Sequence, residues 1–174
     1  MKKWLLLLLL PFSLYFCTGP ALDSNEKLIK RLNQHSQELE PIARLIWEQG
    51  NAGVVDIRDG TWSTDIGPNM RIEPEALKSQ LTTAQLETLE EAGVRIASSD
   101  TFYGGVLFVT NESGIGMSGS ISGFIWKGKE FNPELIVSDL NKVVESKKGT
   151  EAAHEDYWLI RPLNDKWGIF FESH

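Results

Sequence analysis

The chain has few of the residues from which covalent cross-links and metal sites are usually built. It contains one cysteine, Cys17, and only three histidines among 174 residues. A single cysteine excludes a disulfide within the chain and a zinc site built on several thiolates. The formal net charge is −7, and no basic cluster is larger than Lys147-Lys148. Nucleic acid is therefore not an expected partner, because its phosphates require a basic surface.

The one long apolar run lies at the amino end. Lys2 and Lys3 precede Trp4 and six leucines, and the apolar run continues to Phe16. Positive charge followed by about a dozen apolar residues is typical of an export signal. The run is too short for a membrane-spanning helix, which needs about 20 residues. The sequence thus predicts an exported protein, periplasmic in a Gram-negative bacterium.

Three fates of this signal stay open. Gly19-Pro20-Ala21 has the small-x-small pattern of a signal-peptidase site, which predicts cleavage after Ala21. In the second reading, Cys17 becomes a lipid-anchored first residue, although Phe16 stands where lipoprotein signals carry a small residue. In the third, the uncut signal stays as an anchor. Membrane contact is expected only in the last two cases. Cleavage after Ala21 leaves 22–174 as a single domain without cysteine.

The distribution of apolar residues predicts an α+β domain. Helical spacing, caps and breakers indicate helices over 23–50, 74–81, 82–92 and 132–149. Pro41 either kinks the first helix or begins a second one. Strand-like stretches are 53–58, 94–99, 101–110, 115–126, 157–161 and 167–171. We expect an antiparallel sheet of about five or six strands with helices packed on one face, with room for one parallel pairing.

A glycine-rich stretch imitates a cofactor motif. Residues 114–119 match the dinucleotide fingerprint GxGxxG. That fingerprint must open a helix whose amino end faces the pyrophosphate, whereas the residues after Gly119 alternate like a strand. We therefore expect a glycine- and serine-rich strand and no cofactor.

Catalytic and metal-binding patterns are incomplete. A hydrolase site would use His154 with a serine or a carboxylate, but Ser118, Ser120 and Ser122 lack the GxSxG context. Glu151 and His154 have a spacing that can hold a metal on a helix, yet no second set of ligands is visible. We therefore expect no metal site.

The loop over 59–72 is the predicted binding site. It carries Trp62, Asp65, Met70 and Arg71, and aromatic, Met and Arg side chains are enriched at the centres of protein interfaces. Long loops within compact domains are often functional. The alternative is that Trp62 folds back into the core.

These observations predict a cofactor-free binding protein of the bacterial cell envelope rather than an enzyme. The expected partner is another envelope or exported protein, and an inhibitor or toxin-immunity role suits a small acidic exported domain. One alternative is an envelope hydrolase that uses His154 with a serine or carboxylate. Another is a structural envelope protein anchored by a lipid on Cys17.

Overall fold

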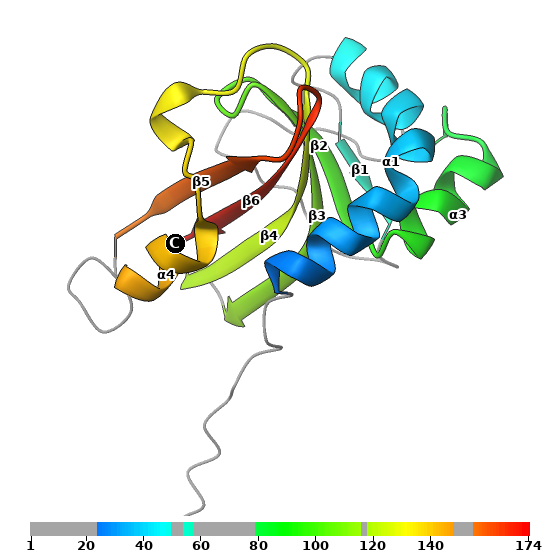
Figure 1. Ribbon diagram of the computed structural model, residues 1–174. Coiled ribbons are helices and arrows are strands. Elements are labelled where there is room, and N and C mark those ends of the chain that lie inside the picture. Colours follow the sequence, from blue (N-terminus) through cyan, green and yellow to red (C-terminus); the bar gives the residue numbers. More distant parts are fainter. Residues whose placement is uncertain (1–23, 50–53, 58–78, 116–117, 148–154) are drawn as a thin grey trace, which may run out of the picture.

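A computed structural model describes residues 24–49, 54–57, 79–115, 118–147 and 155–174 (Figure 1). Within these ranges the elements follow in the order α1 (Asn25–Glu48), β1 (Val54–Asp56), α3 (Thr83–Glu91), β2 (Ile96–Asp100), β3 (Gly105–Ile115), β4 (Ser118–Lys127), the 3₁₀ turn η2 (Pro133–Leu135), α4 (Leu140–Lys147), β5 (Tyr157–Pro162) and β6 (Trp167–Ser173). The expected α+β class is confirmed.

The strands form one antiparallel sheet in the order β1-β2-β3-β4-β6-β5. Each of the six strands pairs with a strand next to it in sequence, and the pairing of β4 with β6 is the one that skips a strand. The only parallel contact among the described residues is an isolated bridge between Ile136 and Ile160. The sheet has six strands, at the upper end of the expected number.

The three α-helices found within the described ranges pack on the same face of this sheet, which we call the helix face. Figure 1 shows α1 crossing the sheet, with α3 beyond it and α4 near β5. Leu32 of α1, Leu89 of α3 and Leu140 of α4 belong to one buried cluster with strand residues such as Phe108 and Phe124. The predicted one-sided packing is therefore confirmed, and burial of this apolar area drives it.

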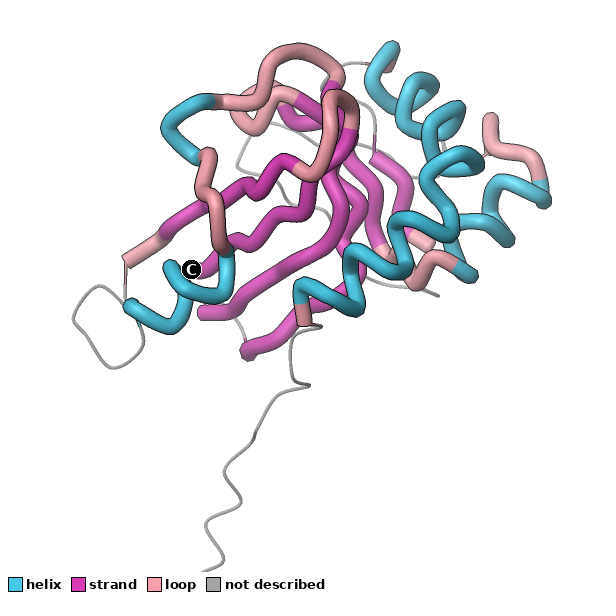
Figure 2. The backbone as a smooth tube through the Cα atoms, in the orientation of Figure 1, coloured by secondary structure: helices cyan, strands magenta, loops and turns pink. Residues whose placement is uncertain are grey.

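α1 is a single helix that bends. Ser24, one residue beyond the predicted cap Asp23, accepts the N–H of Lys27 at 3.3 Å. Pro41 lies inside the helix, and Figure 2 shows that α1 changes direction in its middle. Proline lacks an N–H and its ring crowds the carbonyl one turn earlier, so it kinks a helix. Of the two alternatives, the kink is the one observed.

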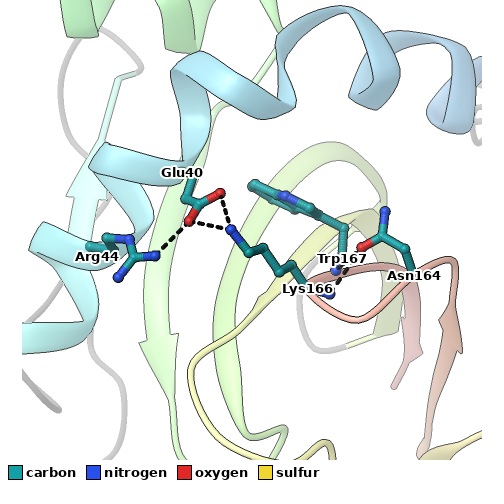
Figure 3. A network of polar contacts seen from close by, with 5 residues as sticks. All are labelled: Glu40, Arg44, Asn164, Lys166 and Trp167. Atoms are coloured by element: carbon teal, nitrogen blue, oxygen red, sulfur yellow. Dashed lines mark hydrogen bonds and ion pairs between the residues drawn. The ribbon is translucent and has the colours of Figure 1, made fainter.

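A polar network fastens the bent part of α1 to the β5–β6 turn (Figure 3). Glu40 accepts from Lys166 Nζ at 2.8 and 3.0 Å and from Arg44 at 2.6 Å. The hydrogen bond from Lys166 and, to a smaller extent, the one from Arg44 lower the pKa of the Glu40 carboxyl. Asn164 closes the turn by accepting the N–H groups of Lys166 and Trp167, both at 2.9 Å. The network holds the hairpin against the helix.

α3 forms as its sequence predicts. Thr82 and Gln85 make a capping box, in which Thr82 Oγ1 accepts the Gln85 N–H at 3.2 Å and Gln85 Oε1 accepts the Thr82 N–H at 2.9 Å. Gly93 follows the helix with a φ of +69°, a backbone conformation that glycine adopts without a steric penalty. Helix start and stop signals were therefore sufficient here.

The helix predicted over 132–149 is wrong as a single element. Asn132 and Pro133 open only the short turn η2, and α4 begins at Leu140. Between them, the Val137 N–H donates to the Ile160 carbonyl at 2.8 Å, which places this segment on the edge of β5. The chain therefore crosses the sheet edge, because Leu135 is buried on one face and Leu140 on the other.

Two predicted strand boundaries also differ. β3 begins at Gly105 rather than at Thr101, because 101–104 form a turn. The turn expected at 111–114 is strand, with a register shift between Val109 and Asn111, and β4 follows from Ser118. The expectation that the glycine-rich stretch is followed by a strand rather than a helix is confirmed.

Candidate functional site

The predicted binding residues Trp62, Asp65, Met70 and Arg71 lie outside the described residues. Glu151 and His154 also lie outside the described residues. The base proposed for the hydrolase alternative, His154, therefore has no described position. Ser122 is 3% exposed, and Ser120 approaches only the Ser173 hydroxyl, at 3.5 Å. The buried Ser122 is a poor nucleophile, because a substrate must be able to reach the hydroxyl.

The face of the sheet opposite the helices carries a second apolar cluster. Its buried members are Tyr103, Leu107, Val109, Ile125, Phe131, Leu135, Ile160 and Phe170. Leu135 of η2 and Phe131 just before it belong to the segment that reaches this face before crossing the edge of β5. The second face is thus apolar at its centre, and the aromatic residues around it form the candidate site.

Five residues, Phe102, Tyr103, Trp158, Glu172 and His174, form what we call the aromatic–acidic cluster. Phe102 and Trp158 meet edge to face with ring centroids 5.7 Å apart, and Trp158 meets the His174 ring at 6.2 Å. Edge-to-face pairs of this kind hold rings in fixed orientations. Phe102 is nevertheless 50% exposed, so one side of a large apolar ring faces outward.

Tyr103 ties the turn after β2 to the end of β6. Its hydroxyl donates to Glu172 Oε2 at 2.5 Å, and its ring packs edge-on against Phe170 at 6.0 Å. Burial raises the pKa of the Tyr103 hydroxyl far above its usual range, and the negative charge of Glu172 raises it further. Tyr103 therefore stays protonated at any ordinary pH and acts as a hydrogen-bond donor.

Both oxygens of Glu172 have partners. Oε2 accepts from Tyr103, and Oε1 contacts His174 Nε2. The other ring nitrogen of His174 lies 3.7 Å from Asp156 Oδ1. Because Glu172 and Asp156 contact opposite sides of the imidazole, the three groups do not converge on one point. Within the described ranges, no group of three or more His, Cys, Asp or Glu side chains is placed to hold a metal ion.

Asp100 holds the turn that carries Phe102 and Tyr103. Its Oδ1 accepts the N–H groups of Phe102 at 2.7 Å and Tyr103 at 3.3 Å. Burial raises the pKa of the Asp100 carboxyl, these two N–H groups oppose the rise, and the charge of Glu172 adds to it. Two carboxylates thus lie near each other at a partly buried position, which is costly unless a positive charge approaches.

The sequence pattern does not single out these residues as a site. Phe102 and Tyr103 fall within the strand predicted over 101–110, and Glu172 lies beyond the predicted end of the last strand. One local signal is present: Asp100 is followed four and five residues later by Gly104 and Gly105. An aspartate followed closely by glycines is typical of a turn in which the carboxylate accepts backbone N–H groups. No local pattern, however, relates this turn to Glu172, which is 69 positions from Tyr103.

Among the described residues, no helix is both long and apolar enough to traverse a bilayer. Comparison of the chain with protein-family models, with curated proteins and with solved structures found no match.

Proposed function

We propose that this protein is an exported, non-catalytic binding protein that attaches to a basic surface of another envelope protein through the aromatic–acidic cluster. The observation that carries the proposal is Phe102: its ring is half exposed, yet it is held in place by Trp158 and by the turn that Asp100 closes. An exposed aromatic ring held in one orientation binds a partner with little loss of conformational entropy.

The surface around Phe102 continues along β5. Ile136 is the other large hydrophobic residue that is clearly exposed in the described chain, at 44%, and it bridges to Ile160 of β5. Trp158 precedes Ile160 by two residues, so both side chains point to the same face of the strand. Both exposed apolar residues therefore lie beside β5, Phe102 against Trp158 and Ile136 against Ile160, and a partner that covers this strand would contact both.

The charge of the cluster indicates the chemistry of the partner. Glu172 and Asp156 supply carboxylates beside the aromatic rings, and Asp100 lies behind them. An arginine of a partner suits this surface, because its guanidinium can stack on an aromatic ring and donate to a carboxylate. The net charge of −7 also steers the protein toward a basic partner and away from acidic ones.

Binding explains the cluster better than acid–base catalysis. Tyr103 stays protonated and so acts as a hydrogen-bond donor rather than as a base. Glu172 is already the acceptor for the Tyr103 hydroxyl and contacts the His174 ring, so it is held in one position beside the exposed Phe102 ring. Such a surface would block the basic substrate channel or active-site rim of an enzyme. This is the inhibitor or immunity role expected from the size of the domain and the export signal.

The rival function is a hydrolase, and one observation favours it. The raised pKa of Asp100 near Glu172 is a pattern that acid–base enzymes use. In that case Asp100→Asn would abolish turnover of an envelope substrate. The binding function predicts only a small loss of partner affinity in the same variant, because asparagine still accepts the N–H groups of Phe102 and Tyr103 and one negative charge behind the cluster is removed.

The first test is capture of the partner from the native envelope by the tagged full-length protein, followed by affinity measurements with the purified partner. We expect Phe102→Ala to weaken binding by about tenfold or more, as is usual for a central aromatic contact. We also expect Glu172→Gln to weaken it, and higher salt to slow association. Circular dichroism would establish that each variant is folded.

Asp165→Asn is the matched control, because this exposed aspartate lies in the β5–β6 turn, at the far end of the hairpin from Glu172. It removes one negative charge without touching the cluster and should leave the affinity unchanged. Equal affinity of Phe102→Ala, Glu172→Gln and the unsubstituted protein would show that the partner binds elsewhere. Binding that does not respond to salt would argue against a basic partner.

A further inference from the structure

A cavity of about 460 Å³, which shares no residue with the aromatic–acidic cluster, lies between α1, α3 and the middle of β3. Its volume is within the range of small-molecule sites, which is about 300–1,000 Å³. Three of its lining residues are basic, namely Lys27, Arg31 and Arg95, and Glu90 is its one acidic residue. In a protein with a net charge of −7, this concentration of positive charge is local and opposite to the charge of the whole molecule.

The basic side chains come from two separate elements. Lys27 and Arg31 are four residues apart on α1 and so lie on one side of the helix. Arg95 precedes β2 and approaches Glu112 at 3.9 Å, a distance at which its guanidinium still has donors to offer. Lys27 and Arg31 also make further polar contacts within the chain. Their charges nevertheless face the same space from two directions.

Gly93 makes room for one of these side chains. A methyl group added at Gly93 would lie 2.9 Å from Nη1 of Arg31, and the backbone φ there is +69°. The guanidinium of Arg31 thus packs directly over the end of α3, in a position that any larger residue would disturb. The helix end is negative, which holds the cation in place.

The floor of the cavity is formed by a β-bulge. The register of β3 against β4 shifts between Val109 and Asn111, and Thr110 and Asn111 both line the cavity. Bulges often redirect side chains beside functional sites. Thr110 is 4% exposed, and its hydroxyl donates to the Ser122 carbonyl at 3.3 Å. The same hydroxyl oxygen accepts a hydrogen bond from Asn111 Nδ2 at 3.4 Å. The bulge therefore presents an amide group beside the three cations.

We infer that this cavity binds a small molecule that carries an oxyanion group, a carboxylate or a phosphate. Arginine binds either group with two parallel hydrogen bonds, and Arg31 of α1 and Arg95 just before β2 both line this cavity. Ile57 and Val94 add an apolar wall, so a ligand with a short apolar part gains contact as well. This site is independent of the aromatic–acidic cluster and of the partner that the cluster binds.

The experiment is an NMR titration of the isotope-labelled protein with inorganic phosphate in one arm and with butyrate in the other. Amide signals of Thr110, Asn111 and Arg95 are expected to shift with saturation in at least one arm, and the arm that binds more tightly identifies the oxyanion. Arg31→Gln and Arg95→Gln should each weaken that binding by about tenfold, since each removes a charge-assisted pair of hydrogen bonds.

Lys142→Gln provides the matched control, because this exposed lysine lies on α4 and does not line the cavity. It removes the same charge from the molecule and should leave the titration unchanged. Absence of saturable shifts at the cavity in both arms would overturn the inference. An equal loss of affinity in Lys142→Gln would overturn it too, because binding would then depend on total charge alone. Arg95 and Lys142 are exposed and Arg31 is half-buried, and the spectra of the variants show whether each is folded.

Discussion

Asp100 determines the shape of the turn that carries Phe102 and Tyr103. Its Oδ1 accepts both of their backbone N–H groups, and the Gly104 N–H donates to its carbonyl at 3.0 Å. The chain thus leaves β2, turns within four residues and returns as β3. This one carboxylate places an exposed ring and a buried hydroxyl side by side, although its own charge is disfavoured by burial and by Glu172.

Replacing Asp100 by asparagine should make the protein relatively more stable as pH rises. Burial raises the folded-state pKa of Asp100 above its ordinary value, and the charge of Glu172 adds to the rise. Its favourable contribution is therefore complete below the unfolded-state pKa and is lost as pH rises through the folded-state pKa. Asparagine keeps an oxygen that accepts the two N–H groups and never ionises. Urea unfolding between pH 4 and pH 7 should show the difference between variant and parent growing in favour of Asp100→Asn.

Asp165→Asn again serves for comparison, because it removes an aspartate from an exposed turn outside the cluster. A difference that stays constant with pH for Asp100→Asn, or one that shifts in favour of the parent at neutral pH, would show that the carboxylate is stabilised where it lies. Such a result would also weaken the view that the cluster holds an excess of negative charge.

At the scale of elements, the close approach of β3 and β4 depends on a glycine. A methyl group at Gly123 would lie 1.9 Å from the Phe108 carbonyl oxygen and 3.1 Å from the Thr110 nitrogen. Both atoms belong to the backbone of β3 next to the bulge, so neither can move without disturbing the pairing. Glycine in a strand interior often marks such an approach.

Gly123→Ala should therefore destabilise the fold by about 2–4 kcal/mol, the range of severe overpacking. Chemical denaturation monitored by tryptophan fluorescence measures this change. Ser120→Ala on the same strand is the matched substitution and should cost less than about 1 kcal/mol, because its hydroxyl makes only one long contact, at 3.5 Å. Similar stability of the two variants would mean that β4 moves away from β3 more easily than this geometry implies.

Elements with local signals were predicted well, and elements formed by distant contacts were not. α3 follows from its capping box and from Gly93, and the β5–β6 hairpin follows from two apolar stretches around a polar turn. The segment 132–147 has helical spacing, yet its centre pairs with β5. Ile136 bridges to Ile160, and the chain must bury Leu135 and Leu140 on different faces. A continuous helix cannot satisfy both demands.

At the scale of the whole molecule, the two faces of the sheet differ. Helices cover one face, and the opposite face has the aromatic and acidic border that we propose as the surface for partner binding. Export itself is tested on the full-length chain expressed in a Gram-negative host. We expect a periplasmic product whose intact mass is that of a chain starting at Leu22, since signal peptidase cuts after a small-x-small pattern.

Labelling with a fatty-acid analogue distinguishes the other fates of the signal. A labelled product that loses its label in Cys17→Ala would establish a lipid anchor and contradict cleavage after Ala21. A product with the mass of the complete chain in the membrane fraction would establish an uncut anchor. In either case the aromatic–acidic cluster would act at a membrane surface rather than freely in the periplasm.

The sequence by itself determined the class of fold, the bounds of α3 and the strands of the last hairpin, because periodicity, caps and turn residues act over a few positions. It also determined the exclusion of disulfides, since one cysteine cannot pair within the chain. Only the tertiary structure decided the turn at 101–104 and the crossing at the edge of β5. It alone decided the site as well, because a buried hydroxyl takes whichever acceptor the packing brings near, and here that acceptor, Glu172, is 69 residues away from Tyr103.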